Sequence, residues 1–114
     1  MNSDFKITLE QKQAAVPVTV FYIRGWLDGQ SEEQLLETAR TTYEGGARYL
    51  LIDMSDLDTI TSAGIRALQK LYQVYTPKDD RFKIAHLKLC NAPPQIYNVL
   101  GITGFLQNIP MYEN

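Results

Sequence analysis

The sequence predicts an α/β fold in which a mixed β-sheet is flanked by about three to four helices. Three observations lead to this prediction. Short β-branched or aromatic runs alternate with segments of helical periodicity, and glycine or proline separates most of them. One run, residues 49–52, is apolar throughout, which is typical of a strand covered on both faces. We expect one domain over residues 1–114, with the order β-β-α-β-α-β-α-β.

The first two strands form the beginning of this sheet. Phe5, Ile7 and Leu9 alternate with polar residues, which predicts a half-buried strand at a sheet edge. Residues 16–23 are rich in valine and aromatic side chains and predict a second strand that ends at Arg24-Gly25. Asp28-Gly29 then indicates a turn.

A helix and a buried strand follow this turn. Ser31 has the capping-box spacing to Gln34 and is expected to open the helix, which Gly45-Gly46 ends. The apolar side chains at helical spacing are Leu35, Leu36, Ala39 and Tyr43. The buried strand at residues 49–52 should end in an acidic turn that contains Asp53, Asp56 and Asp58.

The second half of the chain repeats the alternation. A helix begins near Ser62, and its apolar stripe consists of Ile65, Leu68, Leu71, Tyr72 and Tyr75. Residues 82–88 predict a fourth strand, and residues 109–112 predict a short last one. Between them, Pro93-Pro94 starts a third helix that ends at Gly101 and Gly104. Its inward-facing residues are Ile96, Val99 and Leu100.

Composition excludes several classes of function. Eleven basic and 13 acidic residues give a net charge of -2, so no nucleic-acid-binding face is expected. No apolar stretch reaches the roughly 20 residues that span a bilayer, and the polar N-terminus does not resemble a signal peptide. With a single cysteine, Cys90, this indicates the cytoplasm. A single histidine, His86, and the lack of a glycine-rich phosphate loop or nucleophile elbow argue against an enzyme, a metal site or a cofactor.

Residues 50–68 (LLIDMSDLDTITSAGIRAL) carry the most specific pattern. A buried strand ends in Asp53-Met54-Ser55, and residues 61–65 (TSAGI) then begin a helix. This pattern resembles the signature of STAS domains, the fold of anti-sigma-factor antagonists and of sulfate-transporter cytoplasmic tails. Residues 24–28 and 96–112 resemble further parts of the same family, so the resemblance covers nearly the whole chain.

The resemblance implies a non-catalytic binding module of the anti-sigma-factor-antagonist type. Its partner would be a kinase-type anti-sigma factor, which would phosphorylate Ser62 and thereby be released. The family often has aspartate where this chain has Thr61, so Thr61 is a second candidate phosphoacceptor. Two alternatives stay open: an accessory subunit of a lipid-transporting ABC ATPase, where threonine can occupy this signature, and a stressosome-type scaffold. A homodimer also stays open.

Each candidate site residue also has a purely structural interpretation. Ser62 and Thr61 fit helix N-caps, and the face with Arg66, Gln69, Lys70 and Gln73 is either solvated or a partner footprint. Trp26 is either an exposed anchor or a cap on the core. Asp28, Asp53, Asp56 and Asp58 lack the spacing of an EF-hand and are read as solvated turn acids, with Asp28 and Asp53 near the phosphorylation site. The expected partner-binding residues are Trp26, Asp28, Asp58, Thr61, Ser62, Ala63, Gly64, Arg66 and Gln69.

Overall fold

The computed structural model describes residues 5–75, 86–102 and 111–112. Its element order is the predicted β-β-α-β-α-β-α-β, and three helices lie within the described residues. The elements are β1 (Lys6–Gln13), β2 (Pro17–Leu27), α1 (Glu32–Glu44), β3 (Leu50–Ile60), α2 (Ser62–Val74), β4 (Leu87–Cys90), α3 (Pro94–Ile102) and β5 (Met111–Tyr112). None of these helices is both long and apolar enough to cross a bilayer.

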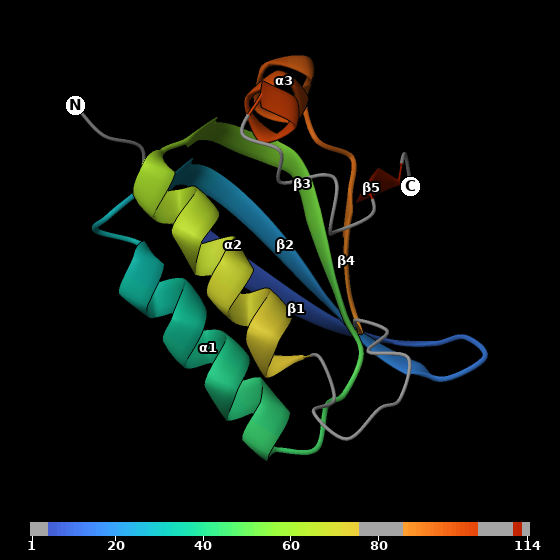
Figure 1. Ribbon diagram of the computed structural model, residues 1–114. Helices are drawn as coiled ribbons and strands as arrows, with labels where there is room; N and C mark the ends of the chain where they lie inside the picture. Colours follow the sequence, from blue (N-terminus) through green and yellow to red (C-terminus); the bar gives the residue numbers. More distant parts are fainter. Residues whose placement is uncertain (1–4, 76–85, 103–110, 113–114) are drawn as a thin grey trace.

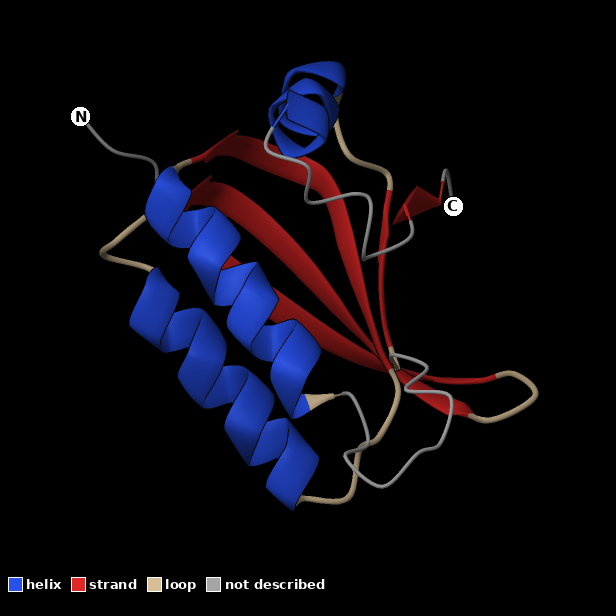
Figure 2. Cartoon of the chain, viewed as in Figure 1, coloured by secondary structure: helices blue, strands red, loops and turns tan. Residues whose placement is uncertain are grey.

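The strands form one mixed sheet in the order β1-β2-β3-β4-β5. β1 pairs antiparallel with β2, and the remaining pairs are parallel, as crossover helices require. β1 is therefore an edge strand, as predicted. In Figures 1 and 2, α1 and α2 lie side by side over one face of the sheet, while α3 stands apart from them beside β3.

The core lies between the sheet and the pair α1 and α2. The predicted inward residues of both helices are buried, except for Tyr43 and Tyr72, which pack partly buried against the core. One predicted inward position is wrong, because Val99 is 36% exposed, and Leu9 on the predicted half-buried strand is 46% exposed. Leu9 lies on the edge strand, where a neighbouring strand covers it from one side only.

Two strands run further than the sequence predicts. β2 does not end at Arg24-Gly25 but continues to Leu27, with Gly25 at a φ of 90° that glycine tolerates. β3 does not turn after residue 52 but runs to Ile60, so the expected acidic turn is a strand. The register shifts between the two strands, and buried Met54, Leu57 and Ile60 hold β3 to the core.

Other boundaries also differ from the prediction. β4 is Leu87–Cys90, so it overlaps the predicted strand at Leu87 and Lys88 and continues two residues further. Residues 82–85 lie outside the described residues, and His86 forms a bend. Gly101 lies within α3 rather than ending it, and Gly104 is outside the described part. Of the predicted last strand, residues 109–110 are likewise not described. The capping box at Ser31 is wrong, because its side chain makes no cap hydrogen bond.

Candidate functional site

The first turn of α2 lies directly against the end of β2. The Thr61 N–H donates a hydrogen bond of 3.0 Å to the Leu27 carbonyl oxygen. Gly64 allows this approach, since a Cβ at this position would lie 2.3 Å from the same oxygen and 2.9 Å from Cγ1 of Ile60. Only glycine fits at position 64 without a clash, so close packing explains the glycine of the predicted signature.

Thr61 is the N-cap of α2, and Ser62 is the first residue of the helix. The Thr61 Oγ1 accepts a hydrogen bond from the Gly64 N–H at 3.4 Å, which is long for this kind of bond. The Thr61 side chain is half-buried, whereas Ser62 is exposed. No hydrogen bond joins the Ser62 hydroxyl to another described residue, so the prediction that Ser62 lies at a helix start with an accessible hydroxyl is confirmed by the geometry.

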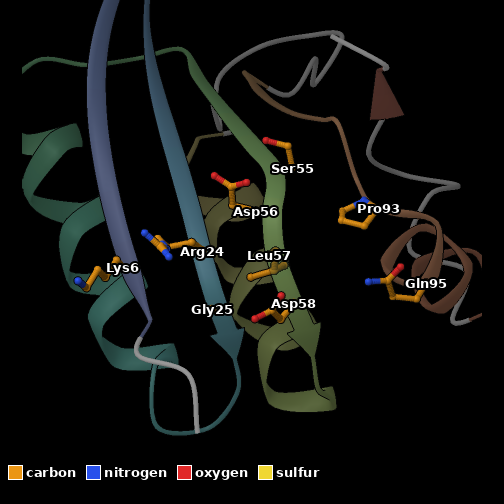
Figure 3. A pocket seen from close by; sticks show the side chains of 9 residues that line it. All are labelled: Lys6, Arg24, Gly25, Ser55, Asp56, Leu57, Asp58, Pro93 and Gln95. Atoms are coloured by element: carbon orange, nitrogen blue, oxygen red, sulfur yellow. The ribbon is translucent and has the colours of Figure 1, made fainter.

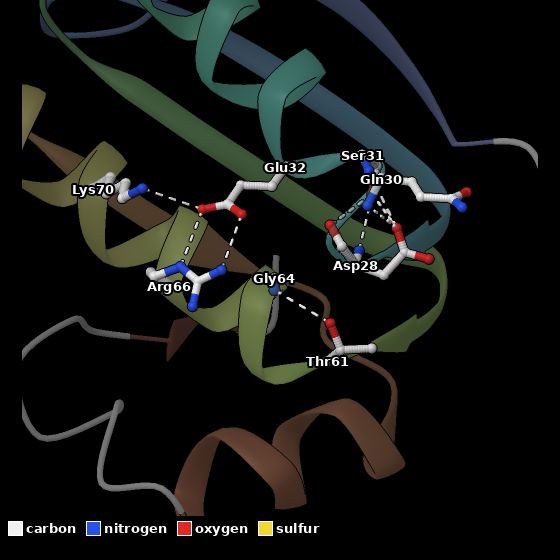
Figure 4. Close-up of polar contacts among 8 residues, drawn as sticks. All are labelled: Asp28, Gln30, Ser31, Glu32, Thr61, Gly64, Arg66 and Lys70. Atoms are coloured by element: carbon white, nitrogen blue, oxygen red, sulfur yellow. Dashed lines mark hydrogen bonds and ion pairs between the residues drawn. The ribbon is translucent and has the colours of Figure 1, made fainter.

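The turn between β2 and α1 supports this site from the side. The Asp28 Oδ1 accepts hydrogen bonds from the N–H groups of Gln30 at 3.0 Å and Ser31 at 3.1 Å (Figure 4). The Ser31 hydroxyl donates to the Trp26 carbonyl at 2.8 Å and accepts from the Asp28 N–H at 2.9 Å. Asp28 therefore stabilises its own turn, as Asx turns do, in addition to any contact with a partner.

An ion-pair cluster joins the two helices beside this turn. Arg66 donates to Glu32 from Nε at 3.3 Å and from Nη2 at 3.2 Å, and Lys70 reaches the same carboxylate at 3.3 Å (Figure 4). These cations, with Arg66 first, hold the pKa of Glu32 below its ordinary value. The face of α2 predicted as a solvated or partner-binding surface is therefore partly engaged with α1.

The structure brings together most of the predicted partner-binding residues. Thr61, Ala63 and Gly64 lie in the first turn of α2, and a Cβ on Gly29 would lie 3.8 Å from that of Ala63, which places the Asp28-Gly29 turn against it. Gln69 is exposed further along α2. Trp26 is half-buried on β2, paired in register with Thr59.

Asp53 and Asp58 lie elsewhere. Asp53 does not end a strand near Ser62; about 23 Å of extended β3 separates it from Ile60. Its carboxylate accepts hydrogen bonds from Ser55 and Asn91, and these outweigh the effect of burial and lower its pKa. Asp58 lines a hollow of about 700 Å³ on the sheet face away from α1 and α2, together with Lys6 and Arg24 (Figure 3).

The sequence did not reveal Glu32 as part of the site. Glu32 lies in the first turn of α1, where an acidic side chain interacts favourably with the helix dipole, and that position alone does not indicate a partner. Glu32 and Arg66 are 34 residues apart, so no local spacing could indicate that they pair. Among the described residues, no group of three histidine, cysteine, aspartate or glutamate side chains is placed to hold a metal ion.

The fold and the site define a class: a small α/β domain with an accessible hydroxyl at the start of a helix. The family model of the STAS domain matches residues 6–114, and the chain belongs to this family. A relative is the candidate anti-sigma factor antagonist BtrV of Bordetella bronchiseptica, which is 29% identical over 78% of this chain and 72% of its own length.

Two solved structures have the same fold. An anti-sigma factor antagonist from Mycobacterium paratuberculosis has a TM-score of 0.73 at 19% identity, over 96% of this chain and 87% of that one. The phosphorylated form of the Bacillus cell fate determinant SpoIIAA has a TM-score of 0.61 at 15% identity, over 91% of this chain and 90% of that one. The chain thus has the STAS fold of anti-sigma factor antagonists, as its sequence pattern predicts.

Proposed function

We propose that this chain is a non-catalytic regulatory module that binds a kinase-type anti-sigma factor and is released from it by phosphorylation at Ser62. The observation that carries this proposal is the exposed Ser62 hydroxyl at the first position of α2. The names of its relatives support the choice of partner, since BtrV is described as a candidate antagonist of this kind.

The hydrogen bonding favours Ser62 over Thr61 as the phosphoacceptor. The Thr61 hydroxyl already caps the helix by accepting from Gly64, and its side chain is half-buried. Ser62 is exposed, and no hydrogen bond joins its hydroxyl to another described residue, so a kinase can reach it. In the transfer, the Ser62 oxygen bonds to the γ-phosphorus of ATP and loses its proton, and ADP leaves from the kinase.

A phosphate at this position changes the surface and leaves the fold intact. It adds a charge of about -1.5 to -2 next to the unpaired N–H groups of the first turn, where the helix dipole favours an anion. No buried group is disturbed, because Ser62 is exposed. A partner that packs on this turn and along α2 towards Gln69 meets the bulk and the charge of the phosphate, so its affinity falls.

Measuring how Ser62 variants bind the partner tests this proposal. The partner is first captured with the unmodified chain and identified by mass spectrometry, and binding is then measured by titration calorimetry. We expect Ser62→Ala to bind as tightly as the unmodified chain and Ser62→Asp to bind at least about tenfold more weakly. Asn98→Asp adds the same charge to an exposed position on α3 and is expected to leave affinity unchanged.

Two outcomes would contradict the proposal. Equal affinities of Ser62→Ala and Ser62→Asp would show that charge at this position does not control binding. Capture of an ABC ATPase in place of an anti-sigma kinase would replace the proposed partner with the alternative of an accessory transporter subunit.

A further inference from the structure

The side chains around Ser62 indicate how its phosphorylation is read. Ser62 and Arg66 are four residues apart on α2, so they lie one above the other on the same face of the helix. Helical side chains lean towards the N-terminus, which brings a long side chain at position 66 back over position 62. The guanidinium of Arg66 is now held by Glu32 through two hydrogen bonds.

We infer that Arg66 moves from Glu32 to the phosphate when Ser62 is phosphorylated, while Lys70 keeps Glu32 paired. This inference rests on the proposed phosphorylation at Ser62. It assigns a positioning role to Arg66, which the sequence placed only in a partner footprint or on a solvated surface.

Arg66 is suited to this exchange by its exposure and its chemistry. Its side chain is 56% exposed, so it can change rotamer without disturbing the core. A planar guanidinium binds carboxylate and phosphate oxygens in the same bidentate manner. The phosphate carries close to twice the charge of the carboxylate and belongs to the same helix as Arg66, so it competes effectively.

Lys70 lowers the cost of the exchange. The Glu32 side chain is only 14% exposed, and a carboxylate left there without a cation would be unfavourable. The Lys70 Nζ lies 3.3 Å from the Glu32 Oε2, while Arg66 approaches both carboxylate oxygens. Departure of Arg66 therefore leaves Glu32 with one cation in place.

The consequence is a change in the surface shared by α1 and α2. In the unmodified chain, one cation cluster bridges the helices beside the first turn of α2 (Figure 4). After phosphorylation, Arg66 would belong to α2 alone and would partly neutralise the phosphate. A partner would then detect both the new anion and the loss of an interhelical bridge.

A phosphorus NMR titration tests the inference without any partner. The chain is prepared with phosphoserine incorporated at position 62, and the second pKa of the phosphate, ordinarily about 6, is measured. A nearby guanidinium stabilises the dianion, so Arg66→Gln should raise this pKa by about 0.3 unit, the size expected for a helical ion pair four residues apart. Glu32→Gln frees Arg66 and should lower the pKa.

Asp28, in the turn between β2 and α1, is a further charged group beside the first turn of α2 and is kept in all of these variants. Lys70 is kept in Arg66→Gln and in Glu32→Gln. The matched control is Arg40→Gln, which removes the same charge from an exposed position on α1 and should leave the phosphate pKa unchanged. Lys70→Gln binds Arg66 more firmly to Glu32 and should give a value between wild type and Arg66→Gln.

Two results would overturn the inference: equal phosphate pKa values in Arg66→Gln and Arg40→Gln, or a raised value in Glu32→Gln. The titration needs no kinase, so a failure of partner binding and a failure of the Arg66 exchange are separate observations.

Discussion

The two helices that cover the sheet begin in contrasting ways. At the start of α1, Ser31 is 5% exposed, and its hydroxyl both donates to the Trp26 carbonyl and accepts from the Asp28 N–H. At the start of α2, Thr61 makes one long cap bond and Ser62 is exposed. At the start of both α1 and α2, the sequence predicts a hydroxyl residue that caps the helix.

The difference separates a hydroxyl that holds a turn together from one that is exposed, which is the kind the proposed phosphorylation requires. The Ser31 oxygen has its hydrogen-bonding capacity filled by the turn, and a kinase could reach it only by unfolding that turn. No hydrogen bond joins the Ser62 oxygen to another described residue. The two serines therefore differ in their neighbours, although both lie at a helix start.

The largest expected effect on stability comes from the close packing at the start of α2. Gly64→Ala would place a Cβ 2.3 Å from the Leu27 carbonyl oxygen, so we expect a loss of about 3 kcal/mol in the free energy of unfolding. Urea denaturation measures this change. Gly101→Ala on α3 is the control, because its Cβ meets no described atom within 4 Å and alanine favours helix. Equal stability of the two variants would mean that α2 is free to shift at its start.

The second prediction compares the two serines directly. Ser31→Ala removes a buried hydroxyl and leaves the Asp28 N–H and the Trp26 carbonyl without their partner, which should cost about 1.5 kcal/mol. Ser62→Ala changes an exposed position and should alter stability by less than about 0.5 kcal/mol. Thermal and urea unfolding of both variants check this order. If Ser62→Ala were less stable than Ser31→Ala, the predicted order of the two serines would be wrong.

The smallest expected effect on stability concerns Glu32 of α1, which forms ion pairs with Arg66 and Lys70 of α2. Because Arg66 and Lys70 lower its folded pKa, Glu32 stabilises the fold above its ordinary pKa of 4.5, and this contribution is lost as pH falls through the lowered value. The stability advantage of wild type over Glu32→Gln should therefore shrink between roughly pH 5 and pH 3. Urea denaturation at several pH values measures it.

The matched control for this titration is Glu33→Gln, which alters the exposed neighbouring residue. Its stability should follow that of wild type as the pH is lowered. Parallel curves for Glu32→Gln and wild type would mean that the cluster does not couple folding to protonation.

The element order and most core positions could be predicted because they depend on local periodicity. The apolar stripes of α1 and α2 and the edge position of β1 are examples. The ends of β2 and β3 could not be predicted. Gly25 and the aspartates of β3 are typical of turns, but the pairing of Leu27 with Ile60 and the burial of Leu57 extend the strands past them.

The candidate site was predicted in its central residues and missed in its surroundings. Ser62 and Gly64 stand in a recognisable sequence pattern, so their place at the start of α2 followed from it. The ion pair of Glu32 with Arg66 and the hydrogen bond from the Ser31 hydroxyl to the Trp26 carbonyl depend on how the helices and the turn pack in space. Such contacts join residues at spacings that no helix or strand period marks.

The sheet order also bears on how the protein is made. Within the described part of the chain, each strand pairs with the one that precedes it, and none is inserted between earlier strands. A chain leaving the ribosome can therefore extend the sheet outward from the hairpin of β1 and β2, one strand at a time. Such sequential growth keeps each strand pairing between neighbouring elements, so the contact order is lower than in a sheet where a late strand is inserted between two early ones.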